Sequence, residues 1–264
     1  MHSATPLVSI VTPSFNQRPY LEATLLSVAR QSYAPLEHWV MDGGSSDGSI
    51  EVIRLHEARL AGWVSESDRG QAHAVNKGLY RARGEILGWL NSDDTYLPDA
   101  VEQVVRCFNA CPDVDVVYGN CDYIDASGAW IRAFTVEPFD RDRLVQIHDY
   151  IPQPATFFRR RVLDRIGVLD ESLHYVLDYE YWLRAAHAGF RFRYLPVALA
   201  TYRLCEGSKT VSHARWKARW EEWRVTRRHG RRFWRWCLGY WIPDMARFRY
   251  HKLRAALSAG KQKP

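Results

Sequence analysis

The sequence of 264 residues is long enough for one large α/β domain with an appendage, and its 47% hydrophobic and 25% charged residues are ordinary for a globular protein. The five cysteines form no CxxC pair and no zinc-binding spacing, which argues against a disulfide scaffold and is typical of a reducing compartment. No apolar run reaches the length of a membrane span or of a signal peptide, so we expect a cytoplasmic protein.

The net charge of +6 is unevenly distributed along the chain. Residues 1–212 hold 21 Lys and Arg against 27 Asp and Glu, whereas residues 213–264 hold 15 against 3. An acidic body with a basic tail predicts two different roles for the two regions. We therefore expect one domain at 1–212 and a basic, Trp-rich helical extension at 213–264.

Short apolar runs alternate with helical patterns in the first half of the sequence. Strands are expected over residues 7–12, 37–42, 63–66, 85–91 and 114–119. Helices are expected over residues 19–31, 46–59, 71–83 and 98–110, with Ser45, Ser46 and Asp47 capping the second one. This alternation predicts a mostly parallel, doubly wound sheet.

The pattern becomes mixed beyond residue 119. We expect a hairpin over residues 123–131 with its turn at 126–128, followed by a strand at 155–159 and a helix at 178–188. Two further strands are expected near residues 192–195 and 199–203. The predicted fold class is therefore α/β, with a mixed second half.

Polar loops follow each of the first four predicted strands. They read PSFN (13–16), DGGSSDG (42–48), ESDRGQ (66–71) and NSDD (91–94), and three of them carry carboxylates. Ligands of open α/β sheets bind at the carboxyl ends of the strands. The four loops are therefore predicted to form one site.

The segments SIVTPSFNQ, VMDGGSSDGS, SESDRGQAHAVNKGL and GEILGWLNSDD closely resemble, in order and spacing, the family 2 glycosyltransferases of the GT-A fold, over about residues 7–204. The resemblance implies an inverting, metal-using enzyme with a Rossmann-like nucleotide half and an acceptor half. The first half would bind a nucleoside diphosphate sugar, usually a uridine (UDP) one. Any single segment is also compatible with an ordinary turn and helix cap.

The residues Ser92-Asp93-Asp94 resemble the DxD-type motif of that family, with Asn91 in its first position. The resemblance implies that Asp94 binds Mg²⁺ or Mn²⁺ and that Asp93 faces the ribose or a coordinated water. Carboxylates suit such hard cations, which would neutralise the charge that develops on a leaving diphosphate. A capped turn before the helix at Pro98 is the alternative.

Other nucleotide contacts are implied by the same resemblance. Thr12 and Pro13 would line the nucleotide, Asp42 would accept the uracil N3–H, and Asp68 would lie close to the base and ribose. Lys77 lies one helix further on, where it could reach a phosphate or simply be solvated.

The segment LDYEYWLR (177–184) is similar to the family segment that begins the acceptor-side helix, and it places Asp178 at the position of the general base. Inversion by single displacement needs one carboxylate, which a helix N-terminus keeps ionised. Glu180 is the reserve candidate, and a simple helix-capping role for Asp178 is the alternative. Residues 153–156 (QPAT) resemble a segment that borders the acceptor pocket.

One position departs from the family pattern. Members often read YRxH near the end of the catalytic domain, where the His can complete the metal shell, and Cys205 stands there in this chain. Thiolate is a poor ligand for Mg²⁺ or Mn²⁺, so water is expected there, or a metal held by Asp94 and the diphosphate alone. Arg203 and Lys209 remain candidate phosphate contacts.

The tail places Trp216, Trp220 and Trp223 on one face of a predicted helix, with basic residues off that face; two similar patterns follow within 233–257. Basic, Trp-rich amphipathic helices are typical of anionic membrane surfaces. The alternative is that the Trp face packs on the body or on a second subunit. Nucleic-acid binding is disfavoured because no recognised module accompanies the charge.

The sequence therefore predicts transfer of a sugar from a nucleotide donor to a hydroxyl of a glycan or lipid-linked acceptor. A peripheral position on the inner face of the cell membrane would fit such an acceptor. Two alternatives remain: a sugar nucleotidyltransferase, which would release pyrophosphate, and a non-catalytic sugar-nucleotide-binding scaffold.

Overall fold

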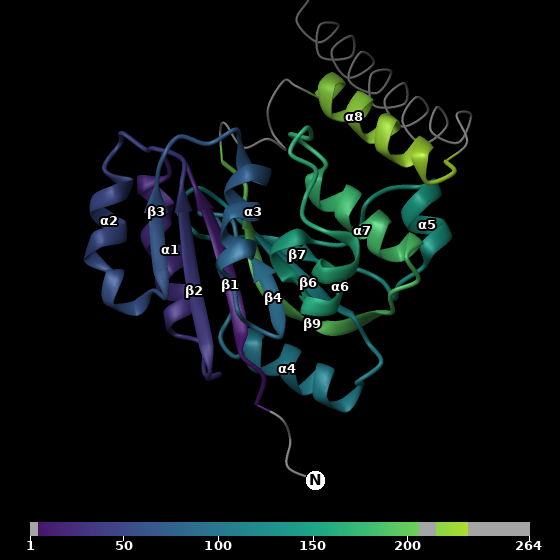
Figure 1. Ribbon diagram of the computed structural model, residues 1–264, viewed down its shortest axis with the longest axis horizontal. Helices are drawn as coiled ribbons and strands as arrows, with labels where there is room; N and C mark the ends of the chain where they lie inside the picture. The colour runs from purple at the N-terminus through teal and green to yellow at the C-terminus, as the bar shows by residue number, and fades with distance from the viewer. Residues whose placement is uncertain (1–4, 206–214, 232–264) are drawn as a thin grey trace, which may run out of the picture.

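A computed structural model describes residues 5–205 and 215–231 (Figure 1). Within these residues, one sheet has the strand order β3-β2-β1-β4-β8-β6-β9-β5, and β7 pairs with β6 outside this path. The sheet and its helices form an α/β fold, as the alternating pattern predicted.

The first half of the sheet is parallel, because β1 pairs in parallel with both β2 and β4, and β2 with β3. We call β1–β4 and their connecting helices the donor half. Its elements are β1 (Val8–Ser14), α1 (Arg18–Ala29), β2 (Leu36–Asp42), α2 (Ser49–Leu55), the short 3-10 helix η1 (Glu57–Arg59), β3 (Gly62–Ser65), α3 (Gln71–Arg81) and β4 (Ile86–Trp89).

The second half of the sheet is mixed, and we call it the acceptor half. β8 runs antiparallel to β4 and β6, whereas β9 runs parallel to β6. Its elements are β5 (Thr95–Tyr96), α4 (Ala100–Ala110), β6 (Val116–Ile124), β7 (Trp130–Phe134), α5 (Arg141–Gln146), the 3-10 helix η2 (Gln153–Ala155), β8 (Thr156–Arg159), α6 (Arg160–Ile166), α7 (Leu177–His187), β9 (Phe192–Arg203) and α8 (Arg215–Arg228).

Several predicted boundaries were wrong in the acceptor half. The strands expected near 192–195 and 199–203 form one continuous strand, β9, because shifts of register opposite Asn120 absorb the irregularity between them. The predicted hairpin turn is confirmed, since Asp125 Oδ1 accepts hydrogen bonds from Ser127 N and Ala129 N. The first arm of that hairpin belongs to the same strand, β6, as residues 116–119.

The start of α2 also differs from the prediction. The helix begins at Ser49, after Gly48 in the left-handed conformation, and neither Ser45 nor Ser46 caps it. The Asp47 carboxylate does accept a hydrogen bond from Ser49 N at 3.0 Å, so its predicted role at this helix start is confirmed in part.

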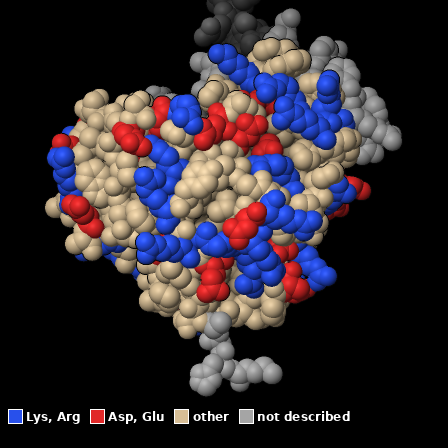
Figure 2. Space-filling model, in the orientation of Figure 1, with Lys and Arg blue, Asp and Glu red and all other residues tan. Residues whose placement is uncertain are grey.

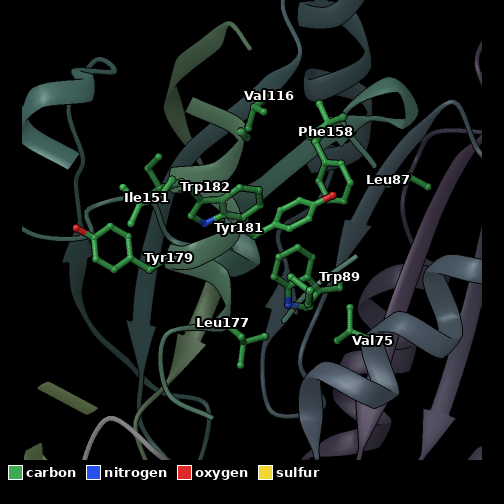
Figure 3. Close-up of a cluster of buried hydrophobic side chains, with 14 of the residues drawn as sticks. Val75, Leu87, Trp89, Val116, Ile151, Phe158, Leu177, Tyr179, Tyr181 and Trp182 are labelled. Carbon is green, nitrogen blue, oxygen red and sulfur yellow. The ribbon is translucent and has the colours of Figure 1, made fainter. Parts of the chain in front are cut away.

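Helices cover both faces of the sheet (Figure 1). Alternate residues of a strand point to opposite faces, and in β1 Val11 joins a core with α3, α6 and α7 whereas Ile10 joins a core with α4. Within the first core, Trp89 of β4 stacks on Trp182 of α7 with ring centroids 5.4 Å apart (Figure 3). Both indoles are fully buried, so this contact fixes the end of β4 relative to α7.

The helix α8 packs on the body beside α5 and α7 (Figure 1). It does so through the buried side chains of Glu221, Val225 and Thr226, whereas Trp216 and Trp220 are 71% and 57% exposed. These two residues are therefore not buried against this chain, and packing of the Trp face on a second subunit stays a prediction. The apolar patterns predicted within 233–257 lie outside the described residues.

Candidate active site

A cleft of about 820 Å³ opens where β1 and β4 end and where α3 and α7 begin. Both halves of the sheet therefore contribute to its walls. Five of the eight site residues predicted from the sequence line the cleft: Pro13, Asp68, Asp93, Asp94 and Asp178.

Thr12 and Lys77 do not line this cleft. Thr12 is fully buried, and its Oγ1 lies 2.8 Å from Nε2 of His38, whose pKa burial lowers to about 3. Lys77 Nζ lies 3.3 Å from Oε1 of Glu66, in an ion pair that keeps it away from the cleft. The structure thus turns Thr12 into the sheet and Lys77 toward the loop after β3.

Asp42 also has a different position from the predicted one. Its side chain is completely buried, and its oxygens accept hydrogen bonds from Gly44 N, Ser45 N, Ser45 Oγ and Ser65 Oγ at 2.5–3.0 Å. These bonds hold the loop after β2 in shape. Asp42 therefore holds the loop that forms one wall of the cleft. Its carboxylate is not free to face a ligand in this structure.

The loop that Asp42 holds presents Gly43 to the cleft. A Cβ atom at Gly43 would lie 2.6 Å from Oδ2 of Asp68, so the absence of a side chain at this position lets Asp68 lie against the loop. Gly70 N donates a hydrogen bond to the other oxygen of Asp68 at 2.8 Å. Asp68 is thus positioned from both sides at the predicted nucleotide wall.

Asp93 and Asp94 place two adjacent carboxylates in the cleft at the end of β4. Asp94 is 1% exposed, and its Oδ1 accepts a hydrogen bond from Arg203 N at 3.0 Å. Burial, followed by the neighbouring Asp93 charge, raises the pKa of Asp94 well above its ordinary value. A cation bound beside Asp94 would favour its charged form and so oppose both of these effects on its pKa.

The cleft offers few protein ligands for a divalent cation. Among the residues that the structure describes, no group of three or more His, Cys, Asp or Glu side chains is placed to hold a metal ion. Mg²⁺ commonly takes only one or two protein carboxylates and completes its shell with phosphates and waters. Asp93 and Asp94 fit this mode of binding, and they do not fit a site built from protein ligands alone.

Three side-chain amides link the two halves across the cleft. Gln71 Nε2 donates to Asn91 Oδ1 at 2.7 Å, and Asn91 Nδ2 donates to Gln153 Oε1 at 2.9 Å. Gln153 Nε2 in turn donates to the backbone oxygen of Trp89 at 2.6 Å. Gln71 and Asn91 belong to predicted strand-end loops and Gln153 to a segment named by the resemblance, but Gln71 was assigned no role of its own.

Asp178 lines the cleft from the first turn of α7. The N-cap position belongs to Val176, and Asp178 Oδ1 accepts a hydrogen bond from Tyr179 N in the first turn at 2.9 Å, so a structural role at this helix start stays an alternative. Glu180 lies elsewhere: it is 6% exposed, and its oxygens accept hydrogen bonds from Arg184 Nε at 2.8 and 2.9 Å. The geometry therefore favours Asp178 over Glu180 as the acid that can reach a ligand.

Neither Arg203 nor Cys205 lines the cleft. Arg203 is 5% exposed, and its Nε donates to the backbone oxygen of Asp93 at 2.9 Å, so it supports the loop and does not project into the cleft. Burial, and then a hydrogen-bonded contact with Cys205, raises the pKa of Tyr20. Lys209, the other predicted phosphate contact, lies outside the described residues.

Several aromatic residues of the cleft were missed from the sequence. Phe15, directly after β1, is 59% exposed and lines the cleft, as does Tyr202 on β9. His174 and Tyr175 line both the cleft and a second hollow of about 520 Å³ beside α8. Only Phe15 stands in a strand-end loop, so the other three had no local signal.

A parallel sheet with carboxylates at its strand ends, joined to a mixed half that carries an acid on its own helix, defines a GT-A-type transferase architecture. The family model described as Glycosyl transferase family 2 matches residues 9–167. An uncharacterized glycosyltransferase of Mycobacterium tuberculosis (strain H37Rv) is 33% identical over 186 residues, which cover 70% of each chain. This chain belongs to glycosyl transferase family 2.

A more distant relative and two solved structures agree with this assignment. The PGL/p-HBAD biosynthesis glycosyltransferase of Mycobacterium bovis is 29% identical over 75% of this chain and 77% of its own. S. aureus TarS 1–349 in complex with UDP-GlcNAc superposes with a TM-score of 0.68 at 18% identity, over 84% of this chain and 66% of that one. The mannosyltransferase PcManGT of Pyrobaculum calidifontis, in complex with GDP-Man and Mn²⁺, gives 0.59 at 22% identity over 86% and 63%.

The chain thus spans just under two thirds of both solved chains, whose likeness shows the shared fold. Among the described residues, none of the helices has the length and apolar character that a bilayer span requires.

Proposed function

We propose that this glycosyltransferase moves a sugar, with inversion, from a UDP-linked donor to a hydroxyl of a glycan or lipid-linked acceptor. One observation carries the proposal: Asp93 and Asp94 from the donor half and Asp178 from the acceptor half line the same cleft. The nucleotide sugars in the complexes of TarS and PcManGT add support for a donor of this class.

On the donor side, Asp93 and Asp94 would hold Mg²⁺ or Mn²⁺ together with the diphosphate. The cation would supply charge neutralisation for the leaving nucleoside diphosphate, an effect of several kcal/mol at the transition state. Asp68 and Pro13 line the same wall and would contact the nucleoside, while Asp42 keeps the loop after β2 in place.

On the acceptor side, Asp178 would accept the proton of the acceptor hydroxyl as its oxygen attacks the anomeric carbon. The bond between that carbon and the diphosphate oxygen breaks in the same step, and the electron pair leaves with the nucleoside diphosphate. Attack from the face opposite the leaving group inverts the anomeric configuration. The position of Asp178 in the first turn of α7 favours its ionised form.

A panel of nucleoside diphosphate sugars tests the proposal when both products are analysed. Release of nucleoside diphosphate with transfer of the sugar is expected, and UDP-sugars should give the highest rate. Release of pyrophosphate would instead establish a nucleotidyltransferase. Tight UDP binding without any turnover would establish a scaffold.

We also propose that the basic extension brings the enzyme to the inner face of an anionic membrane. Residues 213–264 have a net charge of +12, and Lys and Arg side chains gather over α8 (Figure 2). The exposed Trp216 and Trp220 would enter the interface, as is usual for Trp at membrane surfaces. This arrangement would place the cleft near a lipid-linked acceptor.

A further inference from the structure

A distant side chain caps the segment that leads into α7. Of the first N–H groups of the helix, which need partners, it reaches that of the N-cap residue Val176, whose own side chain provides no cap. The carboxylate of Glu221, on α8, accepts hydrogen bonds from the backbone N–H groups that lead into the helix. The distances are 3.0 and 3.1 Å from His174 N, 2.6 Å from Tyr175 N and 3.2 Å from Val176 N.

This cap combines charge with burial. Glu221 is 9% exposed, so its carboxylate has given up much of its water and depends on these three backbone donors. Hydrogen bonds to an ionised acceptor are about twice as strong as neutral ones, and an anion at a helix N-terminus is favoured by the helix dipole. The segment 174–176 is therefore held firmly against α8.

The position of Glu221 is itself fixed by the packing of α8. Val225 and Thr226, one turn further on, are 1% and 0% exposed. The neighbouring Glu222 pairs with Arg231 at 2.6 Å, and Arg231 Nη2 donates to the backbone oxygen of Ile147 at 2.6 Å. The cap is thus part of a docked helix and not a loose surface contact.

The residues that Glu221 holds belong to the wall of the cleft. His174 and Tyr175 line it, and Asp178 follows Val176 by two residues. A displacement of the 174–176 backbone would therefore displace Asp178. Misplacement of a catalytic group by about 1 Å can cost about 10²-fold in rate.

We propose that Glu221 is a positioning residue for Asp178. Through this residue, α8 contributes to the geometry of the active site. The inference rests on the proposed role of Asp178 as general base. Both α7 and α8 lie beyond residue 167, where the match to the family model ends.

The test compares Glu221→Ala and Glu221→Gln with the control Arg227→Gln in the full chain. The control changes an exposed side chain of the same helix. UDP affinity by calorimetry, donor KM and kcat from UDP release, and melting temperature are measured for each. Glu221→Ala should lower kcat about 10- to 100-fold with UDP affinity and donor KM unchanged.

Glu221→Gln should retain part of the rate, because its amide oxygen still accepts backbone hydrogen bonds. Arg227→Gln should keep the wild-type kcat. Amide hydrogen exchange needs no acceptor, and it should become faster at residues 174–176 in Glu221→Ala and not in Arg227→Gln.

Two results would overturn the inference while leaving the proposed function intact. One is an unchanged kcat in Glu221→Ala where Asp178→Asn is inactive, and the other is an equal loss of kcat in Glu221→Ala and Arg227→Gln. If Asp178→Asn itself turns over normally, the assignment of the base fails, and the positioning role fails with it.

Discussion

In the donor half, the polar groups of the cleft come from loops that directly follow β1, β3 and β4. In the acceptor half, they come from η2, from the segment before α7 and from α7 itself, whose N-terminus is held by a side chain of α8. The first arrangement takes its side chains from strand-end loops and is supported by Arg203 of β9, which donates to Asp94. The second depends on α8, through residues about 45 positions apart. The donor half should therefore keep its site when α7 or α8 is disturbed, and this independence can be tested.

The largest effect should come from the donor half. Asp94→Ala removes the most buried carboxylate of the pair, and excess chelator should inactivate the wild type, because the diphosphate charge would no longer be neutralised. A loss of several kcal/mol of transition-state stabilisation would remove most turnover. Full activity in excess chelator, measured as UDP release, would show that no metal acts here.

The contact that joins the two halves should matter for stability. Trp182→Ala removes a fully buried indole that stacks on Trp89, and it should lower the free energy of unfolding by about 3–5 kcal/mol. The exposed Trp220→Ala is the matched control and should change that free energy little. Equal urea midpoints for the two variants would show that the stack does not join the halves.

A smaller effect is expected from the loop after β2. The new Cβ of Gly43→Ala would lie 2.6 Å from Asp68 Oδ2, so Asp68 must move. The donor KM should rise about tenfold, the equivalent of about 1.4 kcal/mol, with kcat nearly unchanged. Lys77→Ala, outside the cleft, should leave both constants unchanged. A rise in KM confined to Lys77→Ala would place the nucleotide elsewhere.

The smallest effect concerns the extension. Vesicles with anionic lipid should bind the full chain better than neutral vesicles, and salt should weaken this binding, because charges are screened within about 8 Å at physiological ionic strength. The double variant Trp216→Ser/Trp220→Ser should fold normally, since both side chains are exposed, but should bind less. Equal binding by the variant and the wild type would contradict the membrane role of these residues.

The sequence predicted the donor half well because its signals are local. Each of the first four strands formed near its expected range, and Pro13, Asp68, Asp93 and Asp94 line the cleft. Asp42 shows the limit of this reasoning. It follows its strand as the others do, but its hydrogen bonds to Ser45 and the distant Ser65 Oγ bury it, and no local pattern reveals that.

The acceptor half was predicted less completely because its contacts are long-range. The resemblance identified Asp178, yet nothing near α7 in the sequence points to Glu221 as its cap. The heptad-like Trp spacing suggested a different packing face for α8 from the one that Glu221 and Val225 form. A helix pattern shows which residues share a face, but not which face finds a partner.

The central claim is that the donor half binds the nucleotide sugar and the acceptor half supplies the group that removes the proton. The variant Asp178→Asn tests this claim most directly. The variant keeps the size of the side chain but cannot accept the proton, so transfer should fall about 10²–10⁴-fold. UDP affinity, measured by calorimetry in Mn²⁺ on the same preparation, should equal that of the wild type. Glu180→Gln, an acid-to-amide change in the same helix but outside the cleft, should retain the transfer rate. Near wild-type transfer by Asp178→Asn, or a loss of UDP affinity as large as its loss of rate, would contradict the account.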